Sequence, residues 1–192
     1  MISTPPEIKK IIGCVLLLIL ANIAVYFNSL NGAFQFDDLP LIQSQWVEDL
    51  DAFDRQVRFS AFENRPVVLW TYALNNTLGK NRVFGFHLFN LTVHIGVTLL
   101  IFLIISRTQY LIASRASGFP LATALLFALH PLNTDSVSYI SSRSSLLVTF
   151  FYLLALYLFT GLFSRKSKIP EFNFRWVLFI PILISAYMSI AS

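Results

Sequence analysis

Residues 84–106 read FGFHLFNLTVHIGVTLLIFLIIS, and none of these twenty-three positions carries Asp, Glu, Lys or Arg. A helix needs roughly 20 predominantly apolar residues to cross the hydrocarbon core of a bilayer. The stretch is long enough for such a helix and too long for an ordinary buried strand. It therefore predicts an integral membrane protein.

Four further apolar segments predict additional spans, so the expected fold class is an all-α polytopic transmembrane helix bundle with about five spans. These segments are residues 8–27, 119–131, 145–163 and 176–191. The 192 residues then form a single transmembrane domain, 1–192. The composition agrees, because 56% of the residues are hydrophobic and only 12% are charged, whereas soluble domains carry about 25% charged residues.

The basic residues predict how the spans are oriented. Eight of the fourteen Lys and Arg residues lie in three short segments, 1–10, 107–118 and 164–175. Short cytoplasmic loops carry an excess of Lys and Arg, so we expect these segments and the N-terminus to be cytoplasmic. Residues 28–83 and 131–144 then face the outer or periplasmic side of a cell membrane, and the short loops favour a bacterial one.

The long loop 28–83 is expected to fold against the membrane surface. It holds seven of the ten acidic residues and is not a low-complexity segment. Residues 47–62 mix aromatic, acidic and basic side chains as an interfacial amphipathic helix does. Residues 66–78 predict a second short helix, because Pro66 suits the first helical position.

Charge and cysteine content narrow the classes of function. A net charge of +4 would suggest a nucleic-acid partner in a soluble protein. Most basic residues here flank apolar segments, so topology accounts for them and no nucleic-acid partner is expected. Cys14 is the single cysteine, which excludes an internal disulfide. No inverted repeat is visible, which argues against a transporter or channel.

Two adjacent carboxylates, Asp37 and Asp38, follow an aromatic pair a few residues beyond the first span. Neighbouring carboxylates suit a general base or a metal ligand. A solvated loop turn is the alternative for an Asp-Asp pair taken alone. The pair is the first candidate for chemistry.

A polar stripe runs along the segment 84–106. His87, Asn90, His94 and Thr98 are separated by helical spacings and share one face,. Polar groups inside a membrane face the bundle or a cavity. The two histidines are about 10 Å apart along a helix, so they cannot ligate one metal ion together without other elements. Hydrogen bonding between helices is the alternative to a functional role. His130 adds a further intramembrane polar group.

Arginine and serine residues on the outer side are candidates for phosphate binding. Residues 130–145 hold six serines and Arg143, and hydroxyls, amides and a guanidinium can together hold a phosphate. A polar helix start is the competing interpretation. Arg65 is a second candidate, with snorkelling towards lipid headgroups as its alternative.

The order of these motifs resembles a known family. The motifs are Phe34-Gln35-Phe36-Asp37-Asp38, Arg65-Pro66, Thr71-Tyr72-Ala73-Leu74-Asn75, Phe86-His87-Leu88-Phe89-Asn90 with His94, Ala124 to Thr134, and Ser138 to Arg143. Together they look like the N-terminal membrane part of the GT-C glycosyltransferases whose eukaryotic members are the TMTC-type O-mannosyltransferases. The resemblance covers nearly the whole chain from about Ala33, and Ala124 to Ser145 is its most specific part.

The resemblance implies a lipid-linked sugar donor, a polyprenyl-phosphate monosaccharide, whose sugar passes to a hydroxyl acceptor on the outer face. Asp37 or Asp38 would act as acceptor base or position the substrates. Arg65, His94 and Arg143 would be candidates for holding the donor phosphate. No cofactor is firmly implied, and the requirement for a divalent metal stays open.

Two alternatives follow from the short length. Family members carry more spans, and often tetratricopeptide repeats, so the chain is expected to be a truncated or split transferase. The other hypothesis is a non-catalytic membrane subunit derived from the same fold, packed against other membrane proteins. Membrane lipids are partners in both.

Overall fold

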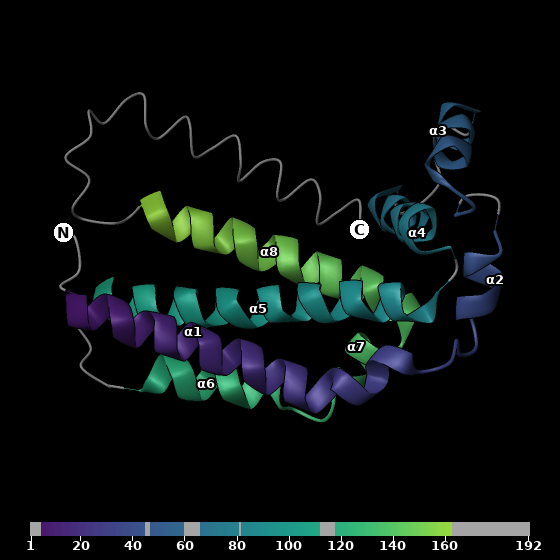
Figure 1. Cartoon of the computed structure of the whole chain (residues 1–192). Helices are drawn as coiled ribbons and strands as arrows, with labels where there is room; N and C mark the ends of the chain where they lie inside the picture. The colour runs from purple at the N-terminus through teal and green to yellow at the C-terminus, as the bar shows by residue number, and fades with distance from the viewer. Residues whose placement is uncertain (1–4, 45–46, 60–65, 81, 112–117, 163–192) are drawn as a thin grey trace.

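The computed structural model describes residues 5–44, 47–59, 66–80, 82–111 and 118–162, and all of its regular elements in these ranges are helical (Figure 1). The elements are α1 (Pro5–Tyr26), η1 (Phe27–Asn31), α2 (Asp38–Ile42), α3 (Leu50–Phe59), α4 (Pro66–Gly79), α5 (Val83–Leu111), α6 (Phe119–Ala128), α7 (Asn133–Ser138), η2 (Ile140–Ser142) and α8 (Arg143–Leu162). The predicted all-α class is confirmed.

Three helical segments within the described residues are long and apolar enough to cross a membrane: Ile8–Asn31, Val83–Tyr110 and Ile140–Thr160. They correspond to the predicted first, second and fourth spans. In a bilayer each backbone amide must be paired within its own segment, and a continuous helix achieves this. The predicted fifth span, residues 176–191, lies outside the described residues, so the count of about five stays a prediction.

The predicted third span is shorter than expected. Its helix α6 begins after Gly118, whose φ of +89° suits glycine,, and ends at Ala128. Pro131 ends the helical pattern because it lacks an amide hydrogen and restricts the residue before it. The chain then continues through a turn into α7.

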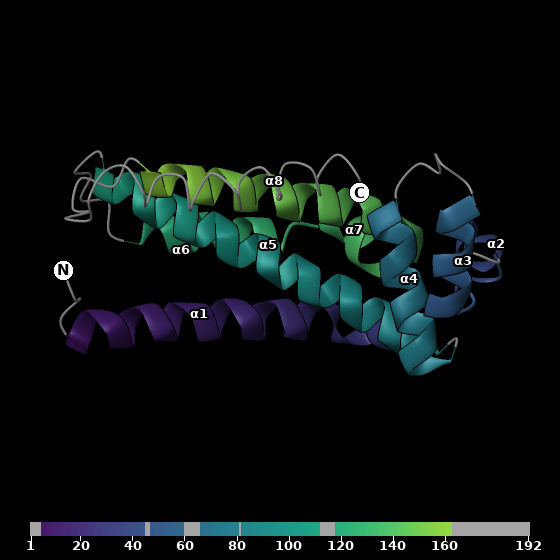
Figure 2. The same ribbon diagram turned by 90° about the horizontal axis from the view of Figure 1, so that it is seen from above.

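The central helix of the bundle is α5, which contacts α1, α6 and α8. Figure 1 shows α8 above it and α6 below it, and Figure 2 shows it between α1 and α8. Leu18 and Ala124 both pack against Phe102, whereas Tyr26 and Phe127 both contact His94. Helices α1 and α6 are therefore antiparallel to α5.

Helix α8 runs parallel to α5. At one end Arg143 binds Asn90, and at the other end Arg107 donates to the Tyr157 carbonyl. Helices α1, α5, α6 and α8 therefore alternate in direction along the chain.

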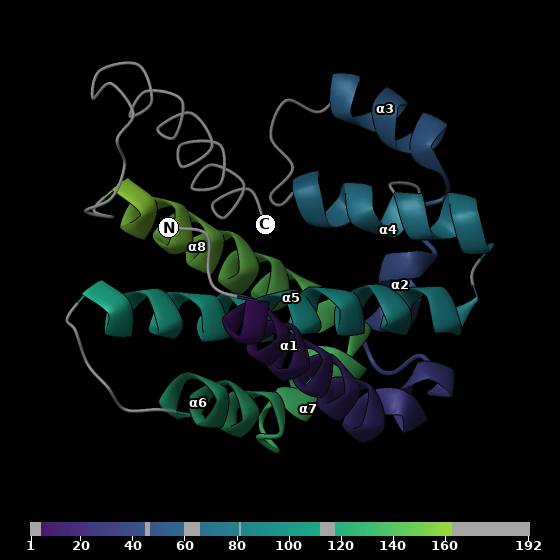
Figure 3. The ribbon, with the colours of Figure 1, turned by 60° about the vertical axis from the view of Figure 1, so that its left-hand side comes forward.

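Helices α2, α3 and α4 gather at one end of the bundle, which we call the loop end (Figures 1 and 3). Figure 3 shows α3 and α4 side by side, as their contacts require. The Asn76 amide donates to the Val47 carbonyl at 2.9 Å and so ties α4 to the segment before α3. The expected short helix at Pro66 and a helix within 47–62 are both present.

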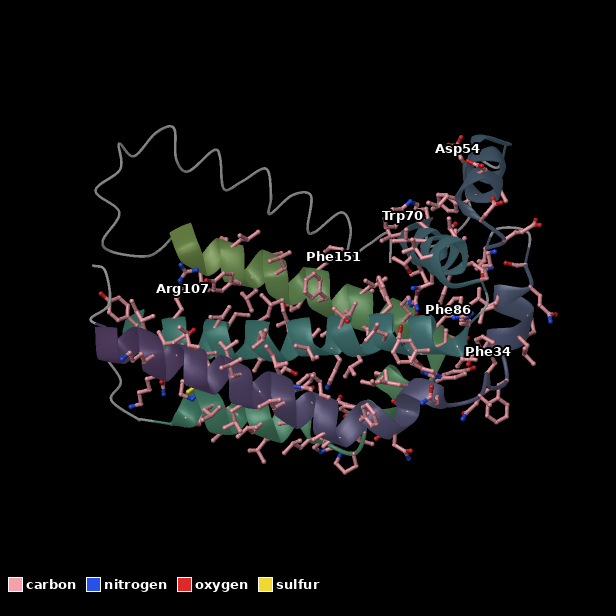
Figure 4. All side chains as sticks on the ribbon, viewed as in Figure 1. Phe34, Asp54, Trp70, Phe86, Arg107 and Phe151 are labelled. Atoms are coloured by element: carbon pink, nitrogen blue, oxygen red, sulfur yellow. The ribbon has the colours of Figure 1, made fainter. Side chains whose placement is uncertain are left out.

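A buried cluster attaches the loop end to the bundle. Its members are Ile42, Val47, Val68, Tyr72, Phe86, Ile140 and Leu147, from α2 to α8. Phe34 packs on the edge of this cluster, with its ring centroid 5.9 Å from that of Phe86 (Figure 4). The loop is thereby held at a fixed position against α5 and α8.

Candidate functional site

The acidic pair lies in a tight turn, which we call the acidic turn, residues 35–38. The Asp38 amide donates to the Gln35 carbonyl at 2.9 Å, and the Gln35 amide donates to Asp38 Oδ2 at 3.0 Å. Phe36 between them has a φ of +42°, a conformation that costs a residue with a bulky side chain about 1–2 kcal/mol. Both ends of the turn are therefore locked by Asp38.

Asp38 also joins the acidic turn to the start of α8. Its side chain is fully buried. Asp38 Oδ1 accepts hydrogen bonds from the Ser141 amide at 2.9 Å and from the Ser141 hydroxyl at 2.7 Å. With the bond from Gln35, this carboxylate accepts three hydrogen bonds from the protein, which suits a residue that holds two segments together.

Asp37 differs from its neighbour in that its side chain is exposed. The Tyr139 hydroxyl donates to Asp37 Oδ2 at 3.3 Å, and among the described residues no donor binds Asp37 Oδ1. Asp37 is thus the carboxylate of the pair that can meet a ligand.

Arg143 lies in a buried site that we call the arginine cage: Thr71, Tyr72, Phe86, Phe89 and Asn90. Its Nε donates to Asn90 Oδ1 at 2.9 Å, Nη1 to Thr71 Oγ1 at 3.2 Å and Nη2 to the Phe86 carbonyl at 3.1 Å. The guanidinium carbon lies 4.3 Å from the ring centroids of both Tyr72 and Phe89. Such cation–π contacts strengthen when they are shielded from water.

The arginine cage argues against the expected role of Arg143 as a ligand of the donor phosphate. Its side chain has no exposed surface, and each guanidinium nitrogen already donates to a protein acceptor. The geometry favours a positioning role, in which α4, α5 and α8 are tied together two residues from Ser141. Arg65, the other arginine expected to bind the donor phosphate, lies outside the described residues.

The predicted polar stripe on α5 faces the interior of the bundle. His87, Asn90, His94 and Thr98 are all buried. His94 packs between the rings of Tyr26 and Phe127, with centroids at 5.3 Å from each. Neither imidazole hydrogen-bonds through a ring nitrogen to the described residues. A phosphate role for His94 stays a prediction that this burial does not favour.

His130 lies away from this stripe. It is exposed at the end of α6, and its Nδ1 accepts from the Leu132 amide at 3.3 Å. Two hydroxyls of the serine-rich segment already bind protein carboxylates. The Ser141 hydroxyl donates to Asp38, and the Ser142 hydroxyl donates to Asp135 at 3.3 Å. Among the described residues no group of His, Cys, Asp and Glu could hold a metal ion.

Sequence reasoning missed the residues that separate the roles of Asp37 and Asp38. Tyr139 and Ser141 lie about a hundred positions further along the chain, and only the fold brings them to the acidic turn. The pattern Ser138-Tyr139-Ile140-Ser141 could have indicated these partners. Tyr139 and Ser141 flank the buried Ile140, so both polar side chains lie on the other side of the segment.

The described helices form a bundle with three candidate membrane spans and the acidic turn at one end, and comparison with known proteins shows which proteins the chain resembles. The chain is 29% identical over 180 residues to Protein O-mannosyl-transferase F38B6.6 of Caenorhabditis elegans, covering 86% of this chain and 24% of that protein. It is 29% identical over 190 residues to Protein O-mannosyl-transferase TMTC3 of Mus musculus, covering 91% and 19%. For Protein O-mannosyl-transferase TMTC1 of Homo sapiens the identity is 30% over 156 residues, covering 74% and 17%.

The chain is thus similar in sequence to protein O-mannosyl-transferases, several of them of the TMTC type. It spans between a sixth and a quarter of the length of these curated relatives. No family model matches the chain, and no solved structure matches it significantly.

Proposed function

We propose that this chain carries the acidic-turn part of a GT-C glycosyltransferase that moves a sugar from a polyprenyl phosphate to a hydroxyl acceptor. The names of its relatives support mannose as the sugar to test first. The loop end, where the acidic turn lies, would face the outer side of the membrane, as the distribution of Lys and Arg favours.

The exposed carboxylate of Asp37 is the observation that carries this proposal. A general base must reach the proton that it removes, and Asp37 is exposed on a turn whose backbone is fixed by Asp38. Asp37 would take the proton from the acceptor hydroxyl as the hydroxyl oxygen bonds to the anomeric carbon. The bond from that carbon to the phosphate oxygen breaks, and the polyprenyl phosphate leaves with its negative charge.

Asp38 and Arg143 would have positioning roles in this scheme. Asp38 holds the turn through Gln35 and Ser141. Arg143 holds the first turn of α8 against α4 and α5. Arg65 is kept as the candidate ligand for the donor phosphate, because a guanidinium can bind two phosphate oxygens at once.

The test measures transfer of radiolabelled mannose from polyprenyl-phosphate mannose to a threonine-containing peptide, with the full chain in membranes. We expect Asp37→Asn to lower the rate by about 10²–10⁴-fold, the usual contribution of a general base, while thermal stability stays at the wild-type value. Asp38→Asn should lower both rate and stability. Wild-type transfer that survives Asp37→Asn would contradict the proposed base.

A second candidate function is a non-catalytic subunit of a larger membrane complex. Exposed apolar side chains on α1 and α8, such as Leu20 and Tyr152, support it. Purification in mild detergent followed by mass spectrometry separates the two. A stoichiometric partner from another complex, together with no transfer by the wild-type chain, would favour the subunit.

A further inference from the structure

The segment predicted as the third membrane span does not form one continuous helix. Helix α6 has 10 residues, so it is about 15 Å long, against a hydrocarbon core of about 30 Å. Residues 129–132 form a turn and α7 adds 6 residues. We call this irregular turn, residues 129–132, together with the first three residues of α7, 133–135, the α6–α7 break.

Contacts with α5 fix the depth of this break. The Phe127 ring stacks on His94, just before the break. Just after it, Val137 packs in one cluster with Leu91, and the Asn90 amide donates to the Tyr139 carbonyl at 3.4 Å. The break therefore lies beside the part of α5 between Asn90 and His94.

That part of α5 belongs to a helix that is long and apolar enough to cross a membrane. The candidate span on α5 runs from Val83 to Tyr110, and its middle is near residue 97. With a rise of about 1.5 Å per residue, His94 is about 4 Å and Asn90 about 10 Å from that middle. Both distances are below the half-thickness of the core, about 15 Å.

The break is polar and exposed at this depth. His130, Thr134 and Asp135 are exposed, and so is Leu132, at 78%. Several backbone groups of the break are satisfied internally: the Asn133 amide donates to the His130 carbonyl at 3.0 Å, and the Thr134 amide donates to the Pro131 carbonyl at 3.1 Å. The side chains are not covered, however, and lipid tails offer no hydrogen bonds to an exposed carboxylate.

Irregular backbone with polar side chains persists at membrane depth only where protein covers it or where it lines a water-filled cavity. We propose that the α6–α7 break lines a water-filled recess that enters the bundle from the loop end. Water is favoured over a packed helix because Asp135 is charged and exposed, with Ser142 as its one hydrogen-bonding side chain among the described residues.

The recess would connect with the acidic turn. Tyr139 follows α7 directly and donates to Asp37, so one residue borders both places. Polar ligands could then approach Asp37 from below the membrane surface as well as from the loop end. The inference depends on membrane depth and exposure alone, so it stands or falls independently of the proposed transfer.

The test uses spin labels on single cysteines in the full chain, with Cys14→Ser as the background, in nanodiscs of phosphatidylcholine and phosphatidylglycerol. Collision with a water-soluble nickel chelate reports water, and collision with oxygen reports lipid. Leu132→Cys and Thr134→Cys place labels on the break. Two controls are expected to face lipid: Leu126→Cys, 74% exposed on α6, and Val25→Cys, 49% exposed on α1.

Val25 controls for depth, because it precedes Tyr26, whose ring centroid lies 5.3 Å from that of His94. We expect nickel collision rates at 132 and 134 several-fold above those at 126 and 25, with the opposite order for oxygen. Oxygen-type accessibility at both break positions would overturn the recess in favour of lipid. Low collision with both reagents would overturn it in favour of covering protein. If one break variant misfolds by circular dichroism, the other decides.

Discussion

At the scale of single residues, Asp37 and Asp38 show how different surroundings give two identical side chains different roles. Asp38 is buried and accepts three hydrogen bonds, whereas Asp37 is exposed and accepts one from Tyr139. A carboxylate with several fixed donors is held in one orientation. We therefore expect substitutions around Asp38 to act through the fold and substitutions of Asp37 to act through chemistry.

Ser141 and Ser142 provide a matched test of this distinction. Ser141→Ala removes the 2.7 Å hydrogen bond to buried Asp38, and hydrogen bonds to charged groups are worth about 1.5–3 kcal/mol. Ser142→Ala removes only an exposed 3.3 Å contact with Asp135. We expect a clear fall in thermal unfolding temperature for the first and little change for the second. Equal melting temperatures would mean that Asp38 does not anchor the acidic turn.

Arg143 should be intolerant even of lysine. An ammonium group cannot reproduce the planar fork that serves Asn90, Thr71 and the Phe86 carbonyl, nor the stacking between two rings. Leaving a buried acceptor unpaired costs about 1–3 kcal/mol. We expect Arg143→Lys to lower the unfolding temperature in detergent strongly.

Arg107→Lys is the control for this substitution. Arg107 also contacts a helix carbonyl and an aromatic ring, both of Tyr157, but it is half-buried at the opposite end of α5 (Figure 4). Its effect should be smaller. Equal losses for the two variants would contradict a special role for the arginine cage.

At the scale of elements, α5 and α8 approach closely at Gly96. A Cβ atom at this glycine would lie 2.8 Å from Phe150 Cε2. Small residues at helix interfaces let membrane helices pack closely. The ring of Phe150 also packs edge-to-face on Phe151, with centroids at 5.4 Å, so it cannot move without disturbing its neighbour.

Gly96→Ala should therefore loosen the contact between α5 and α8, at a cost of about 1–3 kcal/mol, as overpacking does in other cores. Gly13→Ala on α1 is the control, because a Cβ there meets nothing within 4 Å. Unfolding in detergent measures both. Adding Phe150→Leu should recover part of the loss at Gly96, and a strictly additive double variant would argue against the predicted clash.

At the scale of the whole molecule, sequence patterns predicted what depends on length and polarity. Long apolar runs predicted the three helices of the described residues that are long and apolar enough to span a membrane. Helical spacing predicted that His87, Asn90, His94 and Thr98 would face the interior. The patterns could not give the contacts of Asp38 and Arg143, because partners more than fifty positions away are chosen by packing. Pro131 did mark the end of α6, although its consequence for the third crossing needed the depth of neighbouring residues.

The orientation of the whole bundle is the remaining prediction, and it follows from charge. If short basic segments are cytoplasmic, the loop end faces outward. In a Cys14→Ser background, Gln43→Cys on the exposed side of the loop should react with an impermeant maleimide in intact cells. Lys9→Cys and Tyr110→Cys, both at exposed positions, should react only after the cells are permeabilised.

The parallel course of α5 and α8 makes this test stringent. Both helices begin at the loop end, so one orientation fixes the sides of the acidic turn, the arginine cage and the α6–α7 break together. Labelling of Lys9→Cys and Tyr110→Cys in intact cells, with Gln43→Cys protected, would place Asp37 in the cytoplasm. A transferase acting on the outer face would then be excluded, whatever the activity of the Asp37 variants.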